Sequence, residues 1–179
     1  LAGQTVTLPM EAQNDLTTPP VADPSLPLTV LYEDPDVVVV SKPQGMACHP
    51  LRAGEPGTVA SAVVARYPEC AKAAEPVREG GVCHRLDTDT SGALLFAKTP
   101  SAWQKLRSDF AEGLVEKEYL ALVDGSPSDD EFDVTLPLLA GRGGSPKMTV
   151  ATTPEEIYHP AALDAHTCFV VERRGLEHT

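Results

Sequence analysis

The chain has 179 residues, 42% of them hydrophobic, and a formal net charge of −12. This length is enough for one sizeable core, and the hydrophobic content is that of an ordinary globular protein. No apolar run approaches the roughly 20 residues of a membrane-spanning helix. The four cysteines form no C-x-x-C pair, which argues against a zinc site and favours free thiols in a reducing cytoplasm.

The acidic balance weighs against a nucleic-acid-binding protein, because such proteins usually carry a basic patch. The chain has 14 Lys and Arg residues against 26 Asp and Glu residues. An acidic protein can still bind RNA through a local basic cleft, although its average field slows the encounter.

The first third of the chain predicts a linker, two strands and a helix. Residues 1–11 alternate as a short strand would, and residues 13–27 contain four prolines without an apolar period, as in an extended linker. Two β-branched runs, 28–32 and 37–40, predict a strand, a turn and a strand. Residues 58–67 predict a helix with Thr58 as its N-cap. We interpret Lys42 as a solvated strand end and His49 as structural.

The stretch 82–98 concentrates reactive groups in a polar run that leads into an apolar strand, 93–98. Arg85 and Asp87 are two residues apart, so in an extended segment their side chains share one face. A guanidinium beside a carboxylate keeps the carboxylate ionised, and a positioned aspartate can act as nucleophile, base or metal ligand. For an arbitrary Arg-x-Asp pair, however, a solvated ion pair is the commoner outcome.

Two other interpretations of the same aspartates fit less well. The run from Asp87 begins like a calcium loop, but that loop needs a glutamate at its twelfth position, where this chain has Lys98. Aspartate-dependent phosphohydrolases place their aspartates directly after a buried strand, whereas here the preceding residues are Gly-Gly-Val-Cys-His-Arg.

The remaining elements alternate between one clear helix and several strands. Thr99 and Pro100 suit the start of a helix that Gly113 can end. Its apolar face predicts a core role for three residues: Trp103, Leu106 and Phe110. Strands are expected at 115–123, 132–139, 147–151 and 167–172. The pair Arg173-Arg174 is interpreted as a solvated strand end, with a phosphate contact as the less favoured alternative.

Five segments, which follow one another in the family's order, resemble the RluA-type pseudouridine synthase family. The run His-Arg-Leu-Asp at 84–87, with Thr-Ser-Gly at 90–92 and Ala-Lys at 97–98, is similar to the family's HRLD-x-x-TSG-x-x-x-x-AK motif. Residues 42–50 resemble its KP-x-G-x-x-x-HP segment, which implies that Lys42 lies near the active cleft, and residues 117–125 resemble its K-x-Y-x-A-x-V-x-G strand. Lys-Met at 147–148 and Ala-His-Thr at 165–167 resemble its K-M and A-x-T elements.

The resemblance implies an α+β fold with a mixed, mostly antiparallel sheet, few helices and long loops, which the many short strands suit. It implies that residues 1–27 are the end of a preceding small RNA-binding domain plus a Pro-rich linker, and that residues 28–179 are the catalytic domain. The family continues into a TGR-x-HQIR segment whose basic residue pairs with the catalytic aspartate. Because residues 175–179 do not match it, we expect the chain to be a fragment cut at both ends.

The implied activity is isomerisation of uridine to pseudouridine in structured ribosomal or transfer RNA, on a flipped-out nucleotide. By resemblance, Asp87 is the nucleophile or base, Arg85 fills the space that the base leaves and touches phosphate, and Tyr119 stacks on the uracil. Five residues would shape the loop around the substrate: His84, Leu86, Thr90, Ser91 and Gly92. The family implies no metal or other cofactor, RNA but no membrane as partner, a monomer and a cytoplasmic location. The alternative is a non-catalytic RNA-binding module with this fold.

Overall fold

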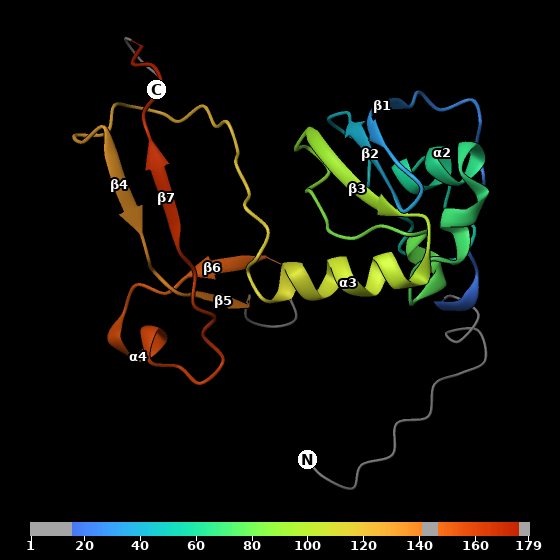
Figure 1. Cartoon of the computed structure of the whole chain (residues 1–179). Helices are drawn as coiled ribbons and strands as arrows, with labels where there is room; N and C mark the ends of the chain where they lie inside the picture. The colour runs from blue at the N-terminus through green and yellow to red at the C-terminus, as the bar shows by residue number, and fades with distance from the viewer. Residues whose placement is uncertain (1–15, 141–146, 176–179) are drawn as a thin grey trace, which may run out of the picture. The chain divides into compact units, whose positions relative to one another are not determined.

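The computed structural model describes residues 16–140 and 147–175 and divides the chain into two compact units (Figure 1). Unit 1 is Leu1–Lys117 and unit 2 is Glu118–Thr179. The strand expected at 1–11 lies outside the described residues.

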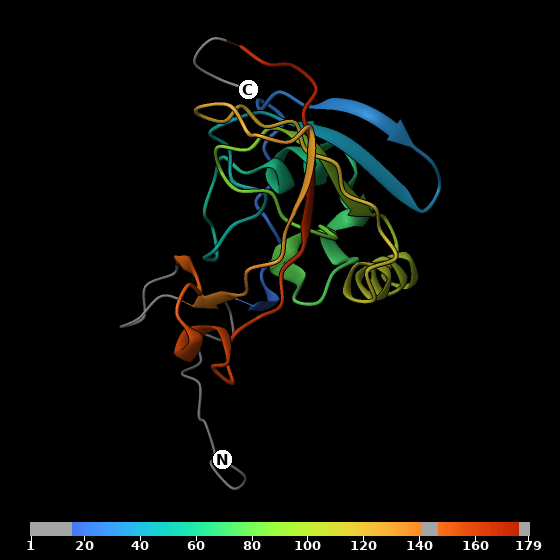
Figure 2. The ribbon, with the colours of Figure 1, turned by 90° about the vertical axis from the view of Figure 1, so that its left-hand side faces the viewer.

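An antiparallel sheet in the order β1-β2-β3 forms the centre of unit 1. Its strands are β1 (Thr29–Glu33), β2 (Val37–Lys42) and β3 (Gly92–Ala97). The hairpin between β1 and β2 (blue in Figure 2) turns because the Asp34 carboxylate accepts hydrogen bonds from the backbone N–H groups of Asp36 and Val37, both at 2.8 Å. This confirms the predicted strand, turn and strand.

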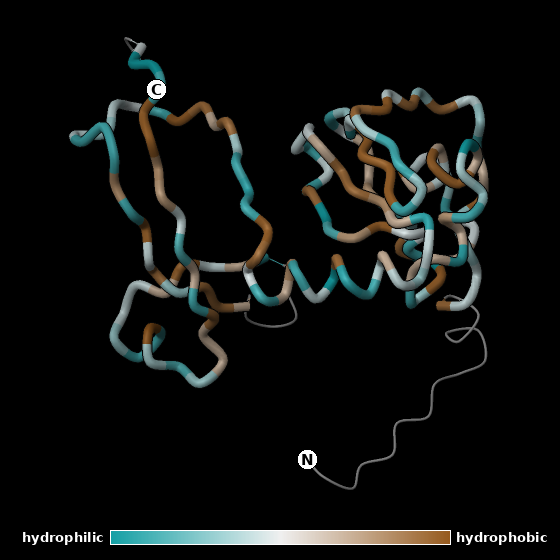
Figure 3. Tube along the Cα trace, in the orientation of Figure 1, coloured by the Kyte–Doolittle hydropathy of each residue, from teal (hydrophilic) through white to brown (hydrophobic). Residues whose placement is uncertain are grey.

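The helix α2 (Val59–Arg66) packs on one face of this sheet, and two short 3-10 helices follow it, η1 (Pro68–Lys72) and η2 (Val77–Glu79). Thr58 caps α2 as predicted, since its hydroxyl accepts from the Ser61 N–H at 3.2 Å. Alternate strand residues face this helix and form the main core: Val38, Val40, Leu94 and Phe96. Figure 3 shows the hydrophobic colour along β2 and β3 that this burial requires.

The helix α3 (Pro100–Ala111) packs against the alternate residues of β3, Leu95 and Ala97. Thr99 caps it, Pro100 opens it, and Gly113 follows its end with a φ of 72°. Trp103, Leu106 and Phe110 pack against this second cluster, which confirms the predicted apolar face, although all three stay half-buried and none belongs to the fully buried core. The Trp103 indole N–H also donates to the Val82 carbonyl at 2.9 Å.

The Pro-rich segment forms no strand in its described part, but within unit 1 it packs against α2 and the loop at Gly80. The Asp23 N–H donates to the Ser61 carbonyl in α2 at 3.0 Å, and Pro20 is buried beside Gly80. The segment therefore contributes to the surface of the sheet domain.

Unit 2 contains two antiparallel pairs, β4 (Glu131–Val134) with β7 (Thr167–Val170), and β5 (Leu138–Ala140) with β6 (Met148–Val150). The single strand predicted at 132–139 is two strands, interrupted just before β5 at Pro137, which has no N–H for a ladder. A one-turn helix, α4 (Pro154–Ile157), forms where an irregular segment was expected, because Thr153 and Glu156 make a reciprocal capping box.

Two further predictions in and around unit 2 are wrong. Residues 115–123 form no strand, and Leu120 and Leu122 are 89% and 79% exposed. Alternating apolar and polar residues would give a strand one buried and one exposed face, but a strand forms only where a neighbouring strand pairs with it. Arg174 is not a solvated strand end, because its guanidinium donates to Ser126, Pro127, Asp129 and Asp130 in the loop before β4.

Candidate active site

The candidate site is the Asp87 loop, residues 84–91, which joins two paired segments. Before it, Gly81 and Cys83 run antiparallel to β3: the Cys83 N–H donates to the Leu95 carbonyl at 2.9 Å and the Ala97 N–H to the Gly81 carbonyl at 2.7 Å. After it, Gly92 begins β3 opposite Lys42. Both ends of the loop are therefore held by one sheet, a rigid support for reactive side chains.

His84 anchors the start of the loop through its ring. Its Nε2 accepts a hydrogen bond from the Leu95 N–H at 3.2 Å, and the ring lies against Phe110, with centroids 4.8 Å apart. Burial lowers the pKa of His84, Lys117 adds to this, and a hydrogen bond with the Arg85 backbone opposes it. An Nε2 that accepts carries no proton, so this geometry fits a neutral ring that holds the loop in place.

Asp87 occupies the first position of a turn, in which its carbonyl accepts from the Thr90 N–H at 3.0 Å. Its side chain is exposed, as is that of Arg85. No ion pair joins Arg85 and Asp87, although both residues lie in the described part of the chain. A rigid turn that presents an unpaired carboxylate leaves that carboxylate free for a substrate.

The other loop residues face the protein to different degrees. Leu86 packs against the main core, and an added Cβ at Gly92, where φ is 144°, would meet Leu86 at 3.8 Å. Thr90 closes the turn through its backbone, and Ser91 is exposed. Their role in substrate binding stays a prediction.

Lys42 is fully buried, so its interpretation as a solvated strand end is wrong. Its ammonium donates to the Pro43 carbonyl at 3.1 Å and to the Thr88 carbonyl at 2.8 Å. The Gly45 N–H donates to the same Thr88 carbonyl at 2.8 Å. The segment 42–45 is thereby attached to the backbone of the Asp87 loop, a contact that no local sequence pattern signals. His49 is buried, and its Nδ1 lies 3.0 Å from the Pro50 carbonyl, as its structural interpretation requires.

Tyr119 belongs to unit 2, where it is 60% exposed in the segment 115–123. Within unit 2, the exposed ring is therefore accessible to a ligand. The other predicted site residues all lie in unit 1: the Asp87 loop contains His84, Arg85, Leu86, Asp87, Thr90 and Ser91, and Gly92 follows it as the first residue of β3.

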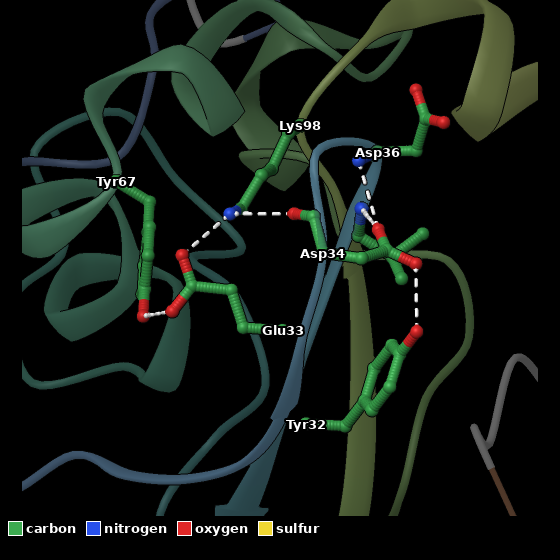
Figure 4. A network of polar contacts seen from close by, with 7 residues as sticks. Tyr32, Glu33, Asp34, Asp36, Tyr67 and Lys98 are labelled. Atoms are coloured by element: carbon green, nitrogen blue, oxygen red, sulfur yellow. Dashed lines mark hydrogen bonds and ion pairs between the residues drawn. The ribbon is translucent and has the colours of Figure 1, made fainter.

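Lys98, the last residue of the long motif, directly follows the end of β3 that is remote from the Asp87 loop. Figure 4 shows its surroundings. Its ammonium donates to the Glu33 carboxylate at 2.7 Å and to the Asp34 carbonyl at 2.9 Å. The Tyr67 hydroxyl donates to the second Glu33 oxygen at 2.7 Å. Burial alone would lower the pKa of Lys98, but the Glu33 hydrogen bond and charge outweigh it and raise that pKa. Lys98 therefore ties the β1–β2 turn to the end of α2.

The groups beside the loop form no metal cluster within the described residues, and the Cys83 thiol that precedes the loop is a protonated one. Within residues 16–140 and 147–175, no three His, Cys, Asp or Glu side chains gather in a way that could hold a metal. Burial raises the pKa of Cys83 to about 12, which keeps this thiol protonated. None of the helices in these ranges has the length and hydropathy of a membrane span.

These features define a class of protein: an α+β domain of antiparallel strands in which a sheet-supported polar loop presents an aspartate. Two solved structures share this fold. Human RNA pseudouridylate synthase domain containing 1 matches with a TM-score of 0.61 and 23% identity over 81% of this chain and 52% of the other. Human RNA pseudouridylate synthase domain containing 4 matches with a TM-score of 0.59 and 21% identity, over 84% and 56%.

Sequence comparison gives the family. The family described as RNA pseudouridylate synthase matches residues 36–167, so the chain belongs to this family, as the motifs and the predicted fold class indicated. An uncharacterized RNA pseudouridine synthase of Synechocystis is 36% identical over 126 residues, 70% of this chain and 38% of that protein. Ribosomal large subunit pseudouridine synthase D of Pasteurella multocida is 35% identical over 123 residues, 69% and 36%. The chain spans less than half the length of these relatives.

Proposed function

We propose that the protein isomerises uridine to pseudouridine in structured RNA and that Asp87 carries the reaction. The observation that supports this most directly is the position of Asp87. It is exposed, free of any ion pair within the described residues, and set in a turn whose two flanks are held by one sheet. Family membership supplies the reaction class, and this geometry supplies a residue that can perform it.

The reaction breaks the N-glycosidic bond, turns the uracil while it is held, and forms a carbon–carbon bond to the same ribose. A base inside a stacked helix is out of reach, so the nucleotide must first flip out. Asp87 acts as nucleophile or general base, and Arg85 occupies the vacated space and touches phosphate. Tyr119 stacks its ring on the uracil, a contact typically worth about 1–3 kcal/mol.

Ribosomal RNA is our first choice of substrate, with transfer RNA second. The name of the Pasteurella relative specifies the ribosomal large subunit, and that relative covers the segment with the Asp87 loop. We further propose that residues 1–27 end a small RNA-binding domain and its linker. A cytoplasmic monomer remains our prediction, which three buried free thiols suit.

The test is tritium release from RNA labelled at carbon 5 of uracil, with this chain and with a version extended beyond Thr179. Asp87→Asn should abolish release by the active protein while leaving its thermal unfolding unchanged. Asp89→Asn is the matched control, since it makes the same change at an exposed residue two positions along the same loop, and it should retain most activity. Substantial release by Asp87→Asn would contradict the proposal.

RNA binding without any tritium release by either version would favour the non-catalytic RNA-binding module. In that case, Asp87→Asn and the unchanged protein should bind RNA equally well.

A further inference from the structure

The Cys48 thiol contacts the backbone immediately before Asp87 in two ways. The Leu86 N–H donates to the Cys48 sulfur at 3.3 Å, and the thiol donates to the Leu86 carbonyl at 3.2 Å. Both distances lie in the range of sulfur hydrogen bonds, in which a thiol is a weak donor and a weak acceptor. Cys48 is only 5% exposed, so these contacts do not compete with water.

Cys48 is itself held by the sheet domain. The Val59 N–H donates to the Ala47 carbonyl and the Ala60 N–H to the Cys48 carbonyl, both at 2.9 Å. These two N–H groups belong to the first turn of α2, where backbone N–H groups have no acceptor within the helix. The contact from Cys48 to Leu86 therefore joins the loop to a rigid helix.

Lys42 holds the backbone immediately after Asp87. Its buried ammonium and the Gly45 N–H converge on the Thr88 carbonyl, each at 2.8 Å. A fully buried ammonium would be costly without acceptors, and here two carbonyls provide them. Leu86 and Thr88, the two neighbours of Asp87, are thus both held by the segment 42–48.

We infer that Cys48 and Lys42 are positioning residues, which fix the backbone on either side of Asp87 and so set where its carboxylate points. The inference rests on the proposed function of Asp87. Neither side chain needs to touch the RNA. Since a misplacement of about 1 Å costs on the order of a hundredfold in rate, loosening either contact should lower the chemical rate without weakening RNA binding.

The test compares Cys48→Ala, Cys48→Ser and Lys42→Met in the active polypeptide with Cys70→Ala as the control. Cys70 is fully buried in the same core cluster, yet it makes no hydrogen bond to residues 84–91. We expect Cys48→Ala and Lys42→Met to lower kcat by about tenfold to a hundredfold at unchanged KM. Cys48→Ser, which keeps a donor and an acceptor, should recover part of the loss. Cys70→Ala should lower the melting temperature but leave kcat within about twofold.

Hydrogen exchange of the Leu86 amide provides a readout that does not depend on activity. Cys48→Ala removes the acceptor of the Leu86 N–H, so the exchange rate at Leu86 should rise by about tenfold or more relative to neighbouring core amides. In Cys70→Ala, the exchange rate at Leu86 should change by no more than the rates of those neighbouring amides. Unchanged Leu86 exchange in Cys48→Ala would overturn the inference, as would equal losses of kcat in Cys48→Ala and Cys70→Ala. If the unchanged protein forms no pseudouridine, the proposed function fails instead, and the exchange data still decide whether Cys48 and Leu86 are in contact.

Discussion

The Glu33 carboxylate accepts hydrogen bonds from both Lys98 and Tyr67 in the polar network at the end of β3 remote from the Asp87 loop (Figure 4). The Lys98 hydrogen bond, and after it the Tyr67 hydrogen bond, lower the pKa of Glu33 below its ordinary value of 4.5. The folded chain therefore holds this proton less tightly than the unfolded chain does. It follows that the stability from Glu33 is complete above the unfolded pKa and is lost as the pH falls through the lower, folded pKa.

We expect Glu33→Gln to lower the free energy of unfolding at neutral pH, and the difference from the unchanged protein to shrink as the pH falls below 4.5. Urea denaturation across this range measures both curves. Glu172→Gln, at an exposed carboxylate in unit 2, is the control and should parallel the unchanged protein. A difference that stays constant with pH would show that packing at Glu33, and not its charge, stabilises the hairpin.

Single residues differ in how far the sequence predicts their roles. The caps Thr58 and Thr99 were predictable, because a cap depends on an N–H only three residues along the chain. Lys42 was not, because its partner Thr88 lies 46 residues away and because lysines at strand ends are usually solvated. Cys48 was missed for the same reason: nothing local indicates that a thiol will meet the backbone beside Asp87.

At the scale of elements, Gly81 decides whether the segment before the Asp87 loop can pair with β3. Its φ is 83°, and a Cβ at this position would lie 2.4 Å from the carbonyl oxygen of Ala97, the last residue of β3. Gly113, after α3, has a similar φ of 72° but open space where its Cβ would be. Substitutions at these two glycines therefore distinguish the free-energy cost of a left-handed backbone conformation from the additional cost of a steric clash.

Gly113→Ala should cost about 1–2 kcal/mol of unfolding free energy, the penalty for a side chain in the left-handed region. Gly81→Ala should cost roughly a further 1–3 kcal/mol, because the added methyl must push the paired backbone apart. Chemical denaturation of both variants measures the difference. Equal losses of unfolding free energy in the two variants would mean that the backbone of residues 81–83 can move away from β3 without destabilising the protein.

Elements were predictable where local signals and burial agreed. The hairpin of β1 and β2, the helices α2 and α3, and strand β3 carry caps, turns or continuous apolar runs, and all form the buried clusters of unit 1 or pack against them. The strand expected at 115–123 has the right alternation, but strand pairing is a property of the neighbour as well as of the sequence. The motif predicted which residues make up the candidate site, whereas the contacts that residues 42–48 make with its loop could be found only in the fold.

At the scale of the molecule, the negative charge is unevenly divided along the chain. Residues 28–117, which include the Asp87 loop, have ten Lys and Arg against twelve Asp and Glu. Residues 118–179 have four against eleven. The part with the candidate site is therefore close to neutral, and most of the field that repels RNA originates from the rest of the chain.

We expect three neutralising substitutions at exposed carboxylates, Glu118→Gln, Asp164→Asn and Glu172→Gln, to speed association with RNA severalfold at low ionic strength. The reason is that charges act over about 30 Å at 0.01 M salt but only about 3 Å at 1 M. Stopped-flow measurement with a labelled ribosomal RNA fragment should show the gain disappear as salt is added. The charge-conserving set Glu118→Asp, Asp164→Glu and Glu172→Asp should associate at the original rate throughout. A gain that persists at high salt would instead place one of these carboxylates in direct contact with the RNA.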